Sequence, residues 1–246
     1  MNLKDLIYRR KSTRSYTNIP VDEATIQKIQ EFTSTIKPLY PDIKVRSEIV
    51  SRENVKCICP WTTSQLITIF TEDKEGALVN VGFIFQQLAL YLHSIGLGVC
   101  WLGMGKLSAQ GIVETKNDDG LEFVMMLAFG EPKGELYRSS TGEFKRKSLA
   151  EISDEQDERL EPARFAPSSV NSQPWYFTHE GDIIHAYCAL QGFLKAKMLG
   201  DMNQIDMGIA LAHMYVTNED TFRFFKADNV RELKGYAYIG SFTVQK

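Results

Sequence analysis

Pro167-Ser168-Ser169-Val170-Asn171-Ser172-Gln173-Pro174-Trp175 is the stretch from which the rest of the chain can be interpreted. Its two prolines fix their own φ, remove backbone donors and disfavour helix at the residue before each of them. The composition therefore predicts a stiff turn that leads into a short strand, Trp175-Tyr176-Phe177. The hydroxyl and amide side chains offer both donors and acceptors, a set suited to a flat ligand with polar edges. On composition alone, a polar loop that caps a strand is the alternative interpretation.

The bulk composition is that of an ordinary globular protein, with one large domain or two small ones. The chain has 246 residues, a hydrophobic share of 43%, a charged share of 24% and a formal net charge of −3. The absence of a basic excess argues against a nucleic-acid partner. No run of about 18 apolar residues and no apolar leader is present, so we expect a soluble cytoplasmic protein without membrane contact. The four cysteines form no zinc-type pair and are expected to be reduced, two or more of them buried, with no metal bound.

A second notable stretch follows a short amphipathic helix predicted over residues 2–10. It reads Arg9-Arg10-Lys11-Ser12-Thr13-Arg14-Ser15-Tyr16 and places four cations within six residues. From charge alone, a solvated surface segment is an alternative to a binding role.

Together these stretches resemble the FMN-dependent nitroreductase family. PSSVNSQPW is similar to the family signature P-S-x-x-N-x-Q-P-W, and the basic stretch resembles R-[RHK]-S-x-[RK]-x-[FY]. The resemblance implies that Arg10 and Ser12 bind the FMN phosphate, with Arg9 as the alternative and Lys11 in the same element, and that Arg14 approaches the N1/O2 edge of the flavin. It also implies that FMN is bound by loop residues, namely Pro167, Ser168, Ser169, Asn171 and Gln173.

Two further segments extend the resemblance. Apolar residues at spacings of three and four predict a buried-face helix over residues 76–94. The run LALYLHSIGLGVCWLG resembles the family's central helix and following loop, which implies that backbone groups of Leu102 and Gly103 face flavin N5 and O4. KRKSLAEI, residues 145–152, resembles a segment whose basic residue reaches the phosphate, which makes Lys145 and Arg146 candidates. His93 is interpreted as a core or surface histidine.

The order of the motifs is unusual, because the family has its P-S-x-x-N loop in the first third of the chain. The helix predicted near residues 205–216 and the strand near 236–240 resemble family elements a second time. We therefore predict an α+β, nitroreductase-like three-layer α/β/α fold with a mostly antiparallel sheet, made of two degenerate repeats, 1–150 and 151–246. Pro60-Trp61 and the strand after it are interpreted as a remnant of the lost loop. A single-chain pseudo-dimer with about one flavin is one expectation, and a rearranged domain that forms a homodimer is the other.

The function implied is that of an NAD(P)H oxidoreductase. FMN takes hydride at N5 and passes electrons by a ping-pong route to a small-molecule acceptor such as a nitroaromatic or quinone, so no side chain need act as a catalytic nucleophile or metal ligand. Phe165, Trp101 and the aromatic residues near Trp175 are candidates for the walls of the site, with a core role as the alternative. Other flavin chemistry on this fold, or a degenerate protein without catalysis, are the alternative functions.

Overall fold

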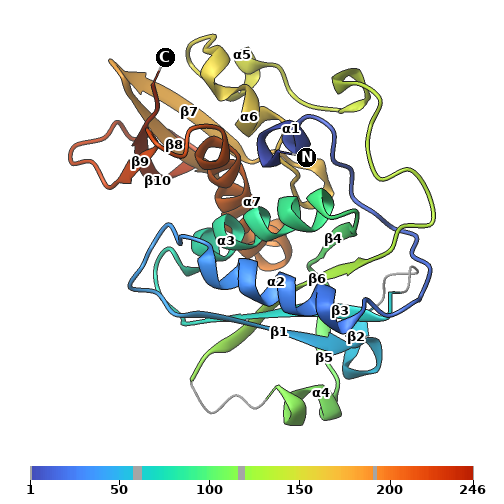
Figure 1. Cartoon of the computed structure of the whole chain (residues 1–246). Coiled ribbons are helices and arrows are strands. Elements are labelled where there is room, and N and C mark those ends of the chain that lie inside the picture. Colours follow the sequence, from blue (N-terminus) through green and yellow to red (C-terminus); the bar gives the residue numbers. More distant parts are fainter. Residues whose placement is uncertain (1, 58–62, 116–119, 191–192, 246) are drawn as a thin grey trace. The chain divides into compact units, whose positions relative to one another are not determined.

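The structure is a computed structural model that describes residues 2–57, 63–115, 120–190 and 193–245. Pro60 and Trp61 lie outside the described residues. The chain forms two compact units. Unit 1 comprises residues 1–77 and 88–141, and unit 2 comprises residues 78–87 and 142–246. The long helix α3 (Ala77–Ser94) therefore contributes residues to both units (Figure 1).

Unit 1 is built on an antiparallel sheet with the strand order β1-β3-β6-β4. A two-stranded ribbon, three helices and part of α3 complete it. The strands are β1 (Val45–Ser51), β3 (Gln65–Thr71), β4 (Gly98–Leu102), β6 (Glu122–Gly130) and the ribbon strands β2 (Val55–Cys57) and β5 (Gly105–Leu107). The helices are α1 (Leu3–Ile7), α2 (Glu23–Thr35) and α4 (Ala109–Glu114).

Local sequence explains the main elements of unit 1. The central strand β3 is mostly apolar and is buried from Leu66 onward, the pattern of a strand covered on both faces. Asp22 caps α2 by accepting a hydrogen bond from the Thr25 amide at 3.0 Å, the contact that favours aspartate at the start of a helix. The Phe32 ring of α2 stacks on Tyr91 of α3 with centroids 4.0 Å apart.

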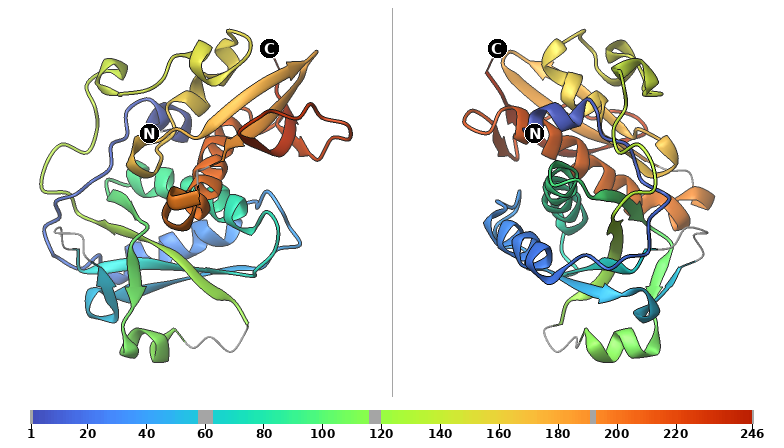
Figure 2. Two further views of the ribbon diagram at one scale, coloured as in Figure 1. Left: turned by 180° about the vertical axis from the view of Figure 1, so that it is seen from behind. Right: turned by 45° about the vertical axis from the view of Figure 1, so that its right-hand side comes forward.

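Unit 2 has its own antiparallel sheet, with the order β7-β8-β10-β9. Gly181, with a φ of 61°, closes the β7–β8 hairpin. The helix α7 packs against β7 and β8, and Figure 2 shows it beside their twisted ribbon. The elements are α5 (Leu149–Ile152), α6 (Glu161–Arg164), β7 (Trp175–Glu180), β8 (Ile183–Ala189), α7 (Phe193–Thr217), β9 (Arg223–Phe225) and β10 (Tyr236–Thr243).

The two sheets share one topology. When the four strands of each sheet are numbered along the chain, their order across the sheet is 1-2-4-3 in both units. Every neighbouring pair is antiparallel. In each unit, a long helix follows the second strand. The α+β fold with antiparallel sheets is thus confirmed, as one sheet in each unit, and the repeated topology supports the predicted duplication.

The shared topology corrects one sequence interpretation. The loop at 167–175 leads into β7, the first strand of its sheet, whereas the strand after Pro60-Trp61 is β3, the second strand of its sheet. The position equivalent to the loop therefore precedes β1, within residues 36–44. The interpretation of Pro60-Trp61 as the remnant of the lost loop was wrong, because similarity around a Pro-Trp pair contains no information about the order of the strands.

Within unit 2, α3 and α7 meet backbone to backbone at two glycines. A Cβ atom added at Gly82 would lie 2.0 Å from the carbonyl oxygen of Ile205, and one added at Gly208 would lie 1.9 Å from that of Val79. Each glycine thus contacts the residue three positions before the other glycine. This reciprocal contact is the kind that a two-fold relation between equivalent elements produces.

Candidate functional site

Unit 1 brings the basic stretch alongside β4. The Thr13 amide donates a hydrogen bond to the Val99 carbonyl at 2.9 Å, and the Tyr16 hydroxyl donates to the Thr13 carbonyl at 2.9 Å. The strand β4 ends at buried Leu102, and exposed Gly103 follows. Two of the segments predicted to bind FMN, the basic stretch and the turn after β4, therefore belong to one hydrogen-bonded assembly in unit 1.

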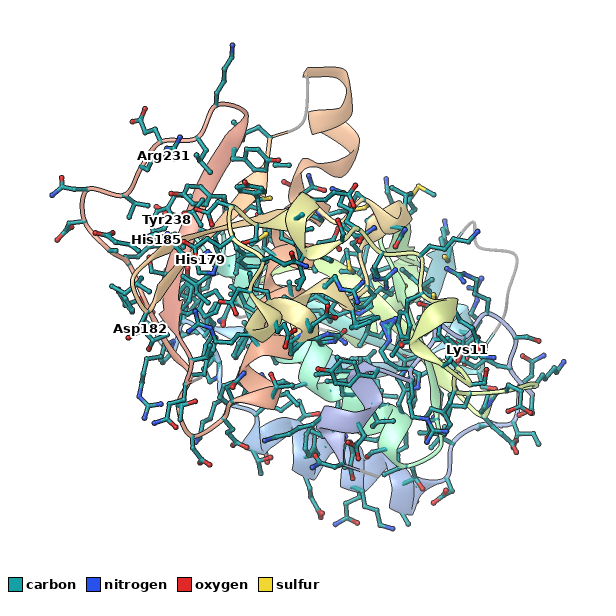
Figure 3. The ribbon with its side chains drawn as sticks, turned by 90° about the horizontal axis from the view of Figure 1, so that it is seen from above. Lys11, His179, Asp182, His185, Arg231 and Tyr238 are labelled. Carbon is teal, nitrogen blue, oxygen red and sulfur yellow. The ribbon has the colours of Figure 1, made fainter. Side chains whose placement is uncertain are left out.

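The basic side chains differ in exposure. Arg9 is exposed, and its guanidinium lies 5.5 Å from the centre of the Tyr137 ring. Arg10 is buried, and its backbone pairs with Tyr137 in an isolated bridge. Lys11, labelled in Figure 3, and Ser12 are half-buried, while Arg14 is exposed. The basic side chains of this short segment therefore range from buried to exposed.

His93 belongs to the core of unit 1. It is 2% exposed, and burial, with a smaller contribution from the charge of Arg10, lowers its pKa to about 3. The imidazole is therefore neutral at physiological pH, and of the two interpretations left open by the sequence, core or surface, the structure shows a core residue.

Gly98 allows the basic stretch to approach β4. A Cβ at this position would lie 2.5 Å from Thr13 Oγ1 and 2.7 Å from Thr13 Cβ. We expect Gly98→Ala to displace the stretch and lower the free energy of unfolding by about 1–3 kcal/mol. Urea unfolding measures the change. Gly134→Ala, whose added Cβ meets no atom within 4 Å, is the matched control, and equal stability of the two variants would contradict the expectation.

The loop at 167–175 in unit 2 has an unusual backbone. Val170, Asn171 and Gln173 have φ values of 47°, 57° and 48°, in the left-handed region that favours glycine. For a β-branched residue such as Val170 this is a true outlier, and each such residue costs on the order of 1–3 kcal/mol. Val170 is also 81% exposed, so the surroundings of its own side chain do not explain the conformation. Strain of this kind is typical of functional sites.

The second basic segment, residues 145–147, holds this loop by hydrogen bonds. The Lys147 amide donates to Gln173 Oε1 at 2.8 Å, and Lys147 Nζ donates to the Gln173 carbonyl at 3.0 Å. Asn171 Nδ2 donates to the Lys145 carbonyl at 2.9 Å, while Arg146 Nη1 donates to Asn171 Oδ1 at 2.5 Å. Two segments that the sequence nominated separately thus form one assembly in unit 2.

A buried carboxylate also holds the loop. The Ser169 amide lies 3.1 and 3.0 Å from the two carboxylate oxygens of Asp206 in α7, and the Gln173 amide donates to Ser168 Oγ at 2.9 Å. Asp206 is 4% exposed, and burial raises its pKa to about 7. The sequence predicts the helix that contains Asp206, but the prediction assigns this residue no role in the site. The available signal was an acid within an otherwise apolar helical run, Ile205-Asp206-Met207-Gly208.

The aromatic candidates belong largely to the core. Phe165 and Trp175 are 4% and 2% exposed, and the Phe165 ring packs against Phe144 with centroids 5.0 Å apart. Trp101 is half-buried. Phe165 and Trp175 therefore follow the core interpretation, and of the three only Trp101 retains substantial exposed surface.

A triad-like constellation on the sheet of unit 2 is structural. His185 Nδ1 lies 2.7 Å from Ser241 Oγ, His185 Nε2 lies 3.3 Å from Glu180 Oε2, and the Tyr238 hydroxyl lies 2.7 Å from Ser241 Oγ. Figure 3 labels His185 and Tyr238. Ser241 is 0% exposed, so it cannot reach a substrate as a nucleophile.

The described parts of the chain contain neither a candidate metal centre nor a helix that could span a membrane. Among residues 2–57, 63–115, 120–190 and 193–245, no three His, Cys, Asp or Glu side chains are grouped so as to hold a metal ion. Over the same ranges, no helix combines the length and the apolar character that a membrane span requires.

Comparison with known proteins identifies the family. The family model described as "Putative TM nitroreductase" matches residues 2–218, so the chain belongs to this nitroreductase family. No curated protein matches the chain.

One solved structure shows the same fold over nearly the whole chain, and two others have a lower similarity. The chain is similar to a structure described as a putative nitroreductase from Thermotoga maritima, at 19% identity and a TM-score of 0.65, over 99% of this chain and 93% of that one. A nitroreductase family protein from Clostridium difficile 630 matches at 15% identity over 61% of this chain and 96% of that one, with a TM-score of 0.48. An FMN-dependent nitroreductase from Clostridium difficile R20291 matches at 15% identity over 59% and 98%, with a TM-score of 0.44.

Proposed function

We propose that the protein is an FMN-dependent oxidoreductase that takes reducing equivalents from NADH or NADPH and passes them to a nitroaromatic, a quinone or a similar small acceptor. Membership of the nitroreductase family supports the class of reaction. The observation that carries the choice of cofactor is the strained loop at 167–175 and its hydrogen bonds to residues 145–147, because this assembly presents a basic segment beside an amide-rich, partly exposed turn.

The donor set fits FMN chemically. A phosphate requires cationic and hydroxyl donors, and the two sets of residues supply arginines, lysines and serines at graded exposure. The edge of an isoalloxazine ring requires amide-type donors and acceptors, which Asn171 and the backbone of the strained loop provide. Arg146 also lies 5.4 Å from the centre of the Phe144 ring, which restricts its guanidinium without removing its charge.

When bound, FMN would supply the hydride chemistry itself. The roles of the chain's own residues are binding and orientation. We assign Arg10 and Ser12, with Lys11 beside them and Arg9 as the alternative, to the phosphate, together with Lys145 and Arg146. Arg14 is assigned to the pyrimidine edge, where a fixed positive charge stabilises negative charge.

The remaining assignments concern polar contacts to the ring system. Backbone groups of Leu102 and Gly103, and the loop residues Pro167, Ser168, Ser169, Asn171 and Gln173, are assigned to it. We predict about one flavin per chain, as expected for a duplicated chain that keeps one motif in each half of its sequence. A homodimer whose flavin sites are shared between two chains would also bind about one flavin per chain, but its mass would be twice that of a single chain.

Flavin binding tests this proposal. The purified protein should show flavin absorption bands at about one FMN per chain, and NADH should bleach them. Arg10→Ala and Arg146→Ala should each weaken FMN binding about tenfold or more, because each removes a charge-assisted phosphate contact worth roughly 1.5–3 kcal/mol. Fluorescence titration gives the dissociation constants, and sedimentation separates the monomer from the homodimer.

The matched control is Arg231→Ala, which removes an exposed cation of unit 2 outside both sets (Figure 3). It should bind FMN as the wild type does. A colourless protein that takes up no added FMN would contradict the proposed cofactor. Unchanged affinity in Arg10→Ala or Arg146→Ala would contradict that residue's assignment.

A further inference from the structure

We propose that Asp206 is the positioning residue of the flavin-binding loop: by accepting the Ser169 amide it holds Ser168–Gln173 in the conformation that binds FMN. This inference rests on the function proposed above and adds a residue that touches the loop without belonging to either ligand set. Its support comes from the geometry of the contact, from the strain of the loop and from a comparison between the two long helices.

Asp206 contacts the loop through the Ser169 amide and, on the same side chain, through Ser172, and each of these two contacts opposes the rise that burial causes in the Asp206 pKa. Both carboxylate oxygens of Asp206 lie within 3.1 Å of the backbone nitrogen of Ser169. Ser169 is the second residue after Pro167. The amide of a residue at the start of the 3-10 turn Ser169–Asn171 has no partner inside that turn, so an external acceptor is needed. Ser169 Oγ also lies 3.2 Å from the sulfur of Met202, one helical turn before Asp206. The helix α7 therefore anchors the loop at its N-terminal side.

The loop needs such an anchor because its backbone is strained. Three of the four residues from Val170 to Gln173 have positive φ without being glycine. Strained backbone persists only where the surroundings over-determine it. On the C-terminal side Lys147 and Gln173 supply two hydrogen bonds, and on the N-terminal side the Asp206 carboxylate supplies the restraint. Val170 and Asn171 lie between these two anchors, and the third strained residue, Gln173, is itself held by the second anchor.

The helices α3 and α7 provide an internal comparison. Their reciprocal glycine contact makes Gly82 equivalent to Gly208, so Asn80 stands at the position of Asp206, two residues before the glycine. Both side chains are buried, at 0% and 4% exposure. The carboxylate stands in the half that keeps the P-S-x-x-N loop, and the neutral amide stands in the half that lacks it. The titratable group that faces Asp206 is the thiol of Cys188 in β8, whose pKa is raised by burial and by this carboxylate.

The test compares Asp206→Ala, Asp206→Asn and His213→Gln in the full-length protein. Asp206→Ala removes the acceptor, whereas Asp206→Asn keeps one oxygen that can accept the Ser169 amide. His213→Gln is the control, because His213 is also a buried polar residue of α7 but bonds to the Pro162 carbonyl and to Gln86 instead of the loop. We expect FMN to bind at least tenfold more weakly to Asp206→Ala, and within about threefold of wild type to Asp206→Asn and His213→Gln.

The second measurement needs no flavin. Amide hydrogen exchange of the flavin-free protein should show that Ser169 exchanges at least tenfold faster in Asp206→Ala than in wild type, with Asp206→Asn close to wild type. Wild-type protection of Ser169 in Asp206→Ala, or wild-type FMN affinity in that variant, would overturn the inference. If the wild type binds no FMN but Ser169 loses protection in Asp206→Ala, the proposed function fails while the anchoring of the loop stands.

Discussion

Gly82→Ala and Gly208→Ala should each be severely destabilising, with a loss of about 3–5 kcal/mol in the free energy of unfolding or no folded protein at all. The added methyl group would lie 2.0 Å or less from a main-chain carbonyl oxygen of the facing helix. A side chain could rotate away from such a contact, but a main-chain carbonyl held within a helix cannot, so the two helices must separate. Separation would remove the packing of buried residues such as Val79 and Ile209 along the crossing.

Urea unfolding of the two single variants and of Gly134→Ala gives the comparison. Gly134→Ala adds the same methyl group where no atom lies within 4 Å and should be close to neutral. The double variant should cost less than the sum of the singles, because one separation of the helices relieves both contacts. Wild-type stability of either single variant would show that the helices do not approach as described.

The second large effect is a dependence of stability on pH that comes from Asp206. Its pKa is raised from the ordinary value of 3.8 to about 7, because the carboxyl group is buried. The folded state therefore holds the proton more tightly than the unfolded state. The contribution to stability is fully present below about pH 4 and is lost as the pH rises to about 7. At about 1.4 kcal/mol for each tenfold change in proton affinity, the loss amounts to about 4 kcal/mol.

Asp206→Asn isolates this contribution, since the amide cannot ionise. Unfolding free energies of the flavin-free wild type and variant, measured by urea at intervals from pH 4 to pH 8, should diverge in favour of the variant as the pH rises. Groups such as Asp157, whose pKa is lowered mainly by its bonds to Arg159 against the opposing effect of burial, act equally in both proteins and cancel in the difference. Parallel curves would mean that Asp206 keeps its ordinary proton affinity in the folded protein.

Much of the fold could be predicted from the sequence because several elements carry local signals. The acidic first turn at Asp22 and the periodic apolar residues of α3 located two helices, and Pro174-Trp175 located the start of β7. The same local signals nominated the four segments of the candidate site. These segments assemble in pairs: the basic stretch lies beside β4, and residues 145–147 bind the loop at 167–175. Because this pairing depends on hydrogen bonds between residues that are distant in the sequence, it was not predictable from the spacing of the motifs.

Other features had no local signal. The strand β8 was missed, because Ile183–Ala189 includes a histidine, a tyrosine and a cysteine and lacks simple alternation. The predicted helix over residues 2–10 ends at Ile7, because Tyr8 caps it and Arg10 pairs with Tyr137. The reciprocal contact of Gly82 and Gly208 was also hidden, since a glycine inside a helical pattern does not show which backbone it will meet.

The membership of residues 78–87 in unit 2 has a consequence for how the protein is made. During synthesis these residues leave the ribosome long before α7, so about half the chain must be made after the N-terminal turns of α3 before their partner exists. Contacts of such long sequence separation slow folding and leave apolar surface exposed in the meantime. Fragment 142–246, produced alone, lacks residues 78–87 of unit 2, whereas fragment 1–141 contains all of unit 1 and leaves residues 78–87 without α7. Unit 2 should therefore recover native structure only when the two fragments are co-expressed or mixed.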